Sequence, residues 1–187
     1  MQHNDYIKEL NGEIGESLVR QLCQLSPTIR ARYSEVLVKF WCLKEFVVRF
    51  DKGIVLPDGK YERCHKRMDA MIFVEPSLNS LAQKWTFKIG IEVKANIKDL
   101  LDDNKMPSYL GWSDFFLIAV PDGLIKAALR KAAADSRIGV VSLTSGKIHK
   151  IPAWQDVSLG RKYEVMEQAF YRYTNKGGMI RTFKMAN

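Results

Sequence analysis

The sequence has little that would place the protein in a membrane. A membrane-spanning helix needs about 20 consecutive apolar residues, whereas the longest apolar run, from Phe115 to Val120, has the length of a single strand. The first residues, Met1 to Glu9, are polar and charged and contain no apolar core of a signal peptide. We therefore expect a cytoplasmic protein without a membrane segment.

Cysteine is also scarce. Cys23, Cys42 and Cys64 are the only three cysteines, and they form neither a Cys-x-x-Cys pair nor a Cys/His cluster. Zinc sites depend on such spacings. The pattern therefore argues against a zinc site and predicts buried free thiols.

The signatures of several enzyme classes are missing as well. The chain contains no Gly-x-x-x-x-Gly-Lys-Ser/Thr loop, no Gly-x-Gly-x-x-Gly, no Gly-x-Ser-x-Gly and no His-Glu-x-x-His. These absences argue against common nucleotide-binding enzymes, α/β-hydrolases and zinc proteases. The histidines His3, His65 and His149 are scattered, so they do not mark a site.

What the sequence does contain is enough apolar material for one core, together with a surplus of positive charge. A chain of 187 residues that is 47% hydrophobic fits one globular domain. Its formal net charge of +8 favours a polyanionic partner such as nucleic acid. The basic residues are densest between Lys60 and Arg67 and between Arg161 and Lys184.

Hydrophobic periodicity gives a simple order of elements. It predicts helices at residues 5–25, 97–104, 124–134 and 161–173, and strands at 45–50, 68–74, 85–93, 114–120, 138–143 and 147–151. The segment 33–43 fits neither period and stays open between helix and strand. This order predicts one α/β domain, residues 1–175, with a mixed central sheet flanked by helices. Residues 176–187 are expected to form a basic, flexible tail.

Two neighbouring strands carry acids inside otherwise apolar sequence. Asp69 lies in the first, and Glu92 and Lys94 lie at the end of the second. Alternate residues of a strand share a face, so Glu92 and Lys94 point the same way, and a hairpin would bring Asp69 beside Glu92. Two carboxylates and the carbonyl of Val93 are hard oxygen ligands that suit Mg²⁺. Such an ion polarises a phosphate, and a nearby lysine can assist the attacking water.

The order Asp, hairpin, Glu-x-Lys resembles the signature of the PD-(D/E)xK nuclease superfamily, although Met68 replaces the usual proline before Asp69. The resemblance implies a restriction-endonuclease-like fold and a nuclease that uses Mg²⁺ or Mn²⁺. It also implies catalytic roles for Asp69, Glu92 and Lys94. Many members add a glutamate from the first helix. Glu16 fits that pattern best, and Glu13 stays open as the alternative.

The stretch from Glu92 to Pro121 also resembles the MmcB-type family of DNA-repair-associated proteins. Its shared features are Glu-x-Lys, an Asp-x-Lys at Asp103 to Lys105, Tyr109, and an Asp-aromatic strand that ends in Val-Pro. The resemblance implies DNA as the partner. Lys66, Arg67, Lys105 and Tyr109 are the residues we expect to bind nucleic acid, by phosphate contacts or by stacking on a base.

Two alternatives stay open. One is a non-catalytic DNA-binding module on the same fold, and the other is a protein-interaction domain of a repair or mobile-element system. The acids Asp99, Asp102 and Asp103 are expected to form a solvated face, and Asp114 to bind a backbone amide in a structural role. The sequence leaves open the type of nucleic acid and whether the protein works as a homodimer or with a partner protein.

Overall fold

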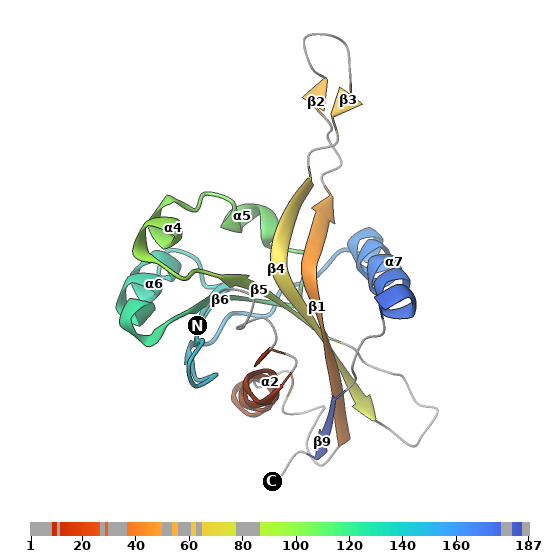
Figure 1. Cartoon of the computed structure of the whole chain (residues 1–187), viewed down its shortest axis with the longest axis horizontal. Helices are drawn as coiled ribbons and strands as arrows, with labels where there is room; N and C mark the ends of the chain where they lie inside the picture. The colour runs from red at the N-terminus through yellow and green to blue at the C-terminus, as the bar shows by residue number, and fades with distance from the viewer. Residues whose placement is uncertain are drawn as a thin grey trace.

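The protein is described by a computed structural model at residues 9–10, 12–26, 29, 37–49, 54–55, 61–62, 65–77, 87–176 and 181–184. In this part of the chain a seven-stranded sheet has the order β8-β7-β6-β5-β4-β1-β9 (Figure 1). Its strands are β1 (Leu37–Arg49), β4 (His65–Ser77), β5 (Phe87–Val93), β6 (Phe115–Val120), β7 (Ile138–Ser142), β8 (Ile148–Lys150) and β9 (Arg181–Lys184). The short strands β2 (Ile54–Val55) and β3 (Tyr61–Glu62) form a separate two-stranded sheet.

The main sheet is mixed. β5, β6 and β7 pair in parallel, whereas β1, β4 and β9 on one side and β8 on the other pair antiparallel with their neighbours. Every residue of β5, β6 and β7 is buried. That burial matches the near-continuous apolar sequence of β6, because parallel strands are covered on both faces. The predicted α/β architecture with a mixed sheet is confirmed.

Helices cover both faces of the sheet (Figure 1). The helices are α2 (Glu13–Leu25), α4 (Ile97–Asp102), α5 (Met106–Tyr109), the 3₁₀ helix η1 (Asp122–Leu124), α6 (Ile125–Ala132) and α7 (Leu159–Lys176). α2 packs into one apolar core, and buried residues of α4, α5, α6 and α7 belong to the other. Among the described residues, no helix is both long enough and apolar enough to cross a bilayer.

The ambiguous segment 33–43 and the strand expected at 45–50 meet in one long strand, β1. Val38 and Phe40 face the α2 core and Leu43 faces the opposite core, as regular alternation requires. Because both faces of this segment are covered, its apolar residues show no clear period of two. The alternation breaks only after Leu43, at the positive φ of 50° of Glu45, so that Phe46 faces the same core as Leu43.

Two terminal predictions need correction. The single helix expected at residues 5–25 is interrupted, because residue 9 is helical, residues 10 and 12 lie in a turn and α2 begins at Glu13, while residues 5–8 and 11 lie outside the described part. The tail expected to be flexible contains β9, which pairs antiparallel with β1 from Leu37 to Phe40. An edge strand presents a row of unpaired backbone groups, and β1 offers such an edge.

The hairpin of β4 and β5 positions the predicted acids. Its register runs from Val74 opposite Phe87 to Ala70 opposite Ile91. One residue further, the same register brings Asp69 beside Glu92. After β5 the chain passes through α4 and α5 before it returns as β6, so these two helices follow directly on the Glu-x-Lys segment.

Candidate active site

Asp69 and Glu92 meet where the β4–β5 ladder ends. The last backbone pair is Ala70 with Ile91. Beyond it, the Oδ2 atom of Asp69 accepts a hydrogen bond of 2.7 Å from the backbone amide of Val93. A side chain thus takes the position that a backbone carbonyl would occupy in a continuing ladder. The predicted proximity of Asp69 to the Glu-x-Lys segment is therefore present.

Glu92 and Lys94 are both buried on the face of the sheet that α4 and α5 cover. Glu92 is 5% exposed and Lys94 is 6% exposed. Val93, which lies between them in the sequence, points to the other face of the sheet and belongs to the core on the α2 side. The Nζ atom of Lys94 donates a hydrogen bond of 3.0 Å to Oε1 of Glu92. The predicted common face of these two residues is confirmed.

Lys94 also contacts two acids from the segment that follows. Its Nζ lies 2.6 Å from Oδ2 of Asp103 and 3.4 Å from Oδ1 of Asp99. Burial lowers the pKa of Lys94, but the contacts and charges of Asp103 and Glu92 outweigh this effect and raise it above its ordinary value. Lys94 is thus a charged ammonium held among carboxylates.

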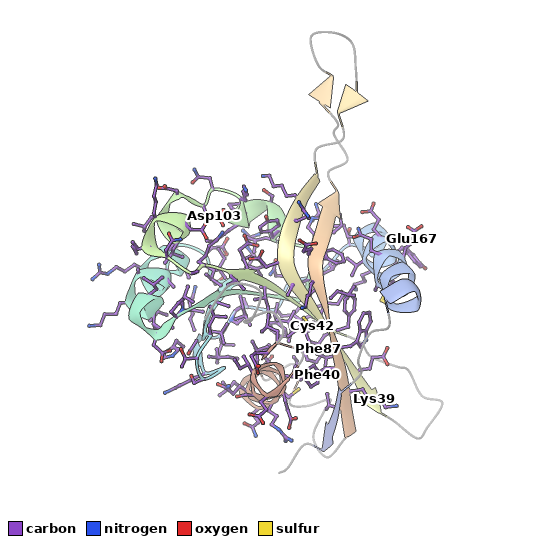
Figure 2. The ribbon with its side chains drawn as sticks, in the orientation of Figure 1. Lys39, Phe40, Cys42, Phe87, Asp103 and Glu167 are labelled. Atoms are coloured by element: carbon purple, nitrogen blue, oxygen red, sulfur yellow. The ribbon has the colours of Figure 1, made fainter. Side chains whose placement is uncertain are left out.

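Asp103 is a site residue that the sequence interpretation missed. It was expected on a solvated face with Asp99 and Asp102, yet it is buried and lies on the α4–α5 side of the sheet (Figure 2). Its Oδ1 accepts a 2.6 Å hydrogen bond from the amide of Lys105, and Lys131 donates to its backbone carbonyl at 2.8 Å. Burial raises the pKa of Asp103, but the contact with Lys94 and the bond from Lys105 lower it below the ordinary value.

The available signal for Asp103 was the Asp-x-Lys spacing from Asp103 to Lys105. The chain turns where α4 ends, and the amide of Lys105 binds the Asp103 carboxylate there. Asp99 and Asp102 remain exposed. The prediction of a solvated face is therefore correct for two of these acids and wrong for Asp103.

Among the described residues, one carboxylate oxygen in the cluster has neither a hydrogen bond nor an ion pair. It is the buried Oε2 of Glu92. Oδ2 of Asp103 also makes no hydrogen bond, but it lies 2.6 Å from the ammonium of Lys94. Burial and, next, the nearby charge of Asp69 raise the pKa of Glu92 to about 7, although Lys94 opposes both effects. A buried carboxylate oxygen without a donor is costly, so the site would gain from a cation or a proton at this oxygen.

Glu16 is not brought to this cluster. α2 packs on the opposite face of the sheet from Glu92 and Lys94, and the carboxylate of Glu16 binds the guanidinium of Arg20 at 2.7 Å. Glu13 is exposed at the start of the same helix. The structure thus gives neither glutamate a contact with the acids on β4 and β5.

The four residues expected to bind nucleic acid fall into two groups. Arg67 and Lys105 are exposed. Lys66 is partly buried and donates a hydrogen bond of 2.7 Å to the hydroxyl of Ser108. Tyr109 is buried, and its hydroxyl donates to the backbone carbonyl of Arg67 at 2.9 Å. Its ring is therefore covered and cannot stack on a base in this conformation, which corrects that part of the expectation.

Tyr109 instead connects two elements that surround the site, α5 and β4. Its hydroxyl links α5 to the β4 backbone two residues before Asp69. Burial raises the pKa of Tyr109, and the charges of Glu92, Asp103 and Asp69 raise it further. The phenol therefore stays protonated and keeps its hydrogen bond.

Asp114 has the structural role expected for it. Its Oδ2 accepts a hydrogen bond of 2.7 Å from the backbone amide of Lys88 and lies 3.0 Å from the ammonium of the same residue. Both side chains are buried. This pair lies on the same strand face as Glu92 but at the other end of β5, so it fixes the start of β6 against β5.

The donor set can be compared with what Mg²⁺ requires. Among the described residues, no group of three or more His, Cys, Asp or Glu side chains is arranged to hold a metal ion. Mg²⁺ in nucleic-acid enzymes keeps several waters and uses only one or two carboxylates. The partnerless Oε2 of Glu92 and the neighbouring Asp69 provide those two groups. The residues therefore fit a largely hydrated Mg²⁺ or Mn²⁺ and do not form a fully protein-made cage.

Comparisons with known proteins add little. No protein-family model matches the chain, and no curated protein matches it significantly. A solved structure of a Silicibacter pomeroyi protein of unknown function is similar over 88% of this chain and 92% of that chain, with 17% sequence identity and a TM-score of 0.45. A similarity of this size assigns neither a family nor an activity.

Proposed function

We propose that the protein is a metal-dependent nuclease of the PD-(D/E)xK type that hydrolyses DNA phosphodiester bonds, in DNA repair or processing. The observation that carries this proposal is the group of Asp69 with the buried Glu92 and Lys94 at the end of the β4–β5 ladder, where one Glu92 oxygen has no hydrogen-bond partner among the described residues. The mixed sheet between helices is compatible with a restriction-endonuclease-like fold.

Each residue has a distinct part in the proposed chemistry. Asp69 and Glu92, with the carbonyl of Val93, would hold Mg²⁺ or Mn²⁺, which supplies positive charge at the scissile phosphate and acidifies water. The hydrogen bond from Val93 to Asp69 orients that carboxylate. Lys94 carries a fixed positive charge beside Glu92, so it can stabilise negative charge that develops on the phosphate.

The backbone of DNA would be held by exposed basic residues around the site. Arg67 lies on β4 two residues before Asp69, and Lys105 lies between α4 and α5. Phosphate contacts of this kind carry little sequence information. Affinity should then fall steeply with salt, by about 0.9 log units per log unit of salt for each phosphate contact on duplex DNA.

A non-catalytic DNA-binding module is the second candidate. The observation that favours it is the close pairing of Lys94 with Asp103 and Glu92. A buried lysine between two carboxylates also serves as a structural ion pair, and a pair of this kind requires no chemistry. The two candidates differ only in turnover, so a cleavage assay separates them.

The test uses purified protein and labelled single-stranded, duplex and branched DNA, with Mg²⁺, Mn²⁺ or EDTA. Glu92→Gln and Lys94→Met remove the proposed chemistry, and Lys98→Ala changes an exposed lysine on α4 as the matched control. Circular dichroism verifies that each variant is folded. Cleavage that requires metal, survives in Lys98→Ala and disappears in the other two supports the nuclease.

The remaining outcomes point elsewhere. Cleavage that survives in both Glu92→Gln and Lys94→Met would place the chemistry away from this site or in a contaminant. Binding without cleavage on every substrate would favour the DNA-binding module. An absence of both would leave the acids as structural ion pairs.

A further inference from the structure

Helix α7 has apolar residues on two separate faces, about 100° apart around the helix axis. Val165 and Ala169 are buried in the core on the face of the sheet that α4, α5 and α6 also cover. On the outer face, Leu159 is 67% exposed, Tyr163 is 69% exposed and Met166 is 45% exposed. A surface helix normally presents polar residues on its solvent side. The fold of one chain therefore accounts for the inner stripe of α7 but not for the outer one.

The outer stripe has the spacing of a two-stranded coiled coil. Leu159, Tyr163 and Met166 follow one another at intervals of four and three residues, and the sequence alone continues that spacing with Phe170 and Tyr173. Alternating intervals of four and three define the a and d positions of a heptad repeat. Single exposed apolar residues are common on protein surfaces, whereas a row at this spacing is typical of a helix that packs against another helix.

The charges beside the stripe are complementary to each other. In the heptad register set by Tyr163 at position a, Lys162 occupies position g and Glu167 occupies position e. Both are exposed, and Glu167 lies on α7 at the outer side of the molecule (Figure 2). In a parallel pair of helices each g residue faces the following e residue of the other helix, and salt bridges there set partner choice and orientation. Lys162 of one copy would then face Glu167 of the second copy, twice per pair.

We propose that this outer stripe of α7 is a homodimer interface, in which two copies of the chain associate in parallel about a two-fold axis along the helix. A two-fold interface uses the same patch on both copies and must complement itself. The α7 stripe meets that requirement, since apolar residues meet their own equivalents and each lysine meets a glutamate. An antiparallel pair would place Lys162 opposite the same flank of the other copy and would lose these salt bridges.

The expected dimer is weak. An α-helix rises 1.5 Å per residue, so the 18 residues of α7 extend over about 27 Å. One pair of such helices buries less than the ~800 Å² per partner of a standard interface. We therefore expect a dissociation constant in the micromolar range and a mixture of monomer and dimer at ordinary laboratory concentrations.

The test is sedimentation velocity of the whole chain from low micromolar to several hundred micromolar. Reversal of one charge, in Lys162→Glu or in Glu167→Lys, turns two attractions into two repulsions and should weaken dimerisation about tenfold. The doubly reversed variant K162E/E167K restores opposite charges across the interface and should return to near the wild-type value. Lys126→Glu, at an exposed position of α6, is the matched control and should have no effect.

A second experiment tests the parallel register. Leu159→Cys should form a covalent dimer under mild oxidation, because equivalent d positions face each other in a parallel pair. Ile151→Cys, exposed but outside α7, and the unaltered chain are its controls. A chain that stays monomeric at several hundred micromolar overturns the proposal. A dimer that neither charge reversal nor Tyr163→Glu weakens overturns it as well.

Discussion

The pH dependence of stability is the most direct consequence of the burial of Glu92 beside Asp69. In the folded protein burial raises the pKa of Glu92 from 4.5 to about 7, helped by the charge of Asp69. Between these two pH values the folded protein holds a proton that the unfolded chain has released. By linkage, the stabilising contribution of this carboxyl is complete below pH 4.5 and is lost as the pH rises through about 7.

The magnitude follows from the size of the shift. Each pKa unit corresponds to 1.36 kcal/mol, so the shift of Glu92 is worth about 3 kcal/mol in the free energy of unfolding. Glutamine has nearly the same shape and does not ionise. Relative to Glu92→Gln, the wild-type protein should therefore lose about 3 kcal/mol between the acidic and the neutral end of this window.

The assay is urea unfolding of both proteins across that pH range in buffer containing EDTA. Glu13→Gln, at an exposed position of α2, controls for the loss of one carboxylate elsewhere. If the difference between wild type and Glu92→Gln stays constant with pH, the carboxyl of Glu92 does not have a raised pKa and the reasoning fails. Added Mg²⁺ that binds the ionised carboxylate should reduce the difference at neutral pH.

Three further predictions concern the packing around the site. Lys94→Met should destabilise the fold by about 3 to 5 kcal/mol, because it leaves buried carboxylates without their cation, whereas the exposed Lys98→Met should change the unfolding midpoint in urea very little. Gly90→Ala should cost about 1 to 3 kcal/mol in the same measurement, since a Cβ there would lie 2.7 Å from both Sδ of Met68 and Oγ of Ser113; an unchanged stability would mean that both side chains move freely. Tyr109→Phe should cost about 1 kcal/mol by loss of its hydrogen bond to the β4 backbone, and equal thermal midpoints for the two proteins would contradict that bond.

The part of the fold that sequence could predict is the part with regular periodicity. β5 and β6 are covered on both faces, so their apolar sequence continues through every position. α6 and α7 follow helical spacing and lie close to the predicted ranges. The first half of β1 resisted prediction because it is covered on both faces by two different cores, so its apolar residues show no clear period of two. The positive φ of Glu45 then changes which core Phe46 faces, and no local pattern in the sequence indicates that change.

The candidate site shows the same division between local and long-range information. Glu92 and Lys94 were predictable as neighbours because a strand places alternate residues on one face. The position of Asp69 beside Glu92 followed from the prediction that the two strands pair as a hairpin. Asp103 could not be assigned by its neighbours in the sequence, since Asp99 and Asp102 are exposed while Asp103 is not. What buries it is the turn after α4 and the contact with Lys94.

That contact bears on how the site works. Lys94 is charged because Asp103 and Glu92 hold it, and Asp103 is ionised because Lys94 and the amide of Lys105 bind it. Lys94 thus shares one positive charge between two buried carboxylates, those of Glu92 and Asp103, and the pKa of Glu92 stays raised although Lys94 lowers it. Among the described residues no donor reaches Oε2 of Glu92, so a divalent cation would supply positive charge at that oxygen.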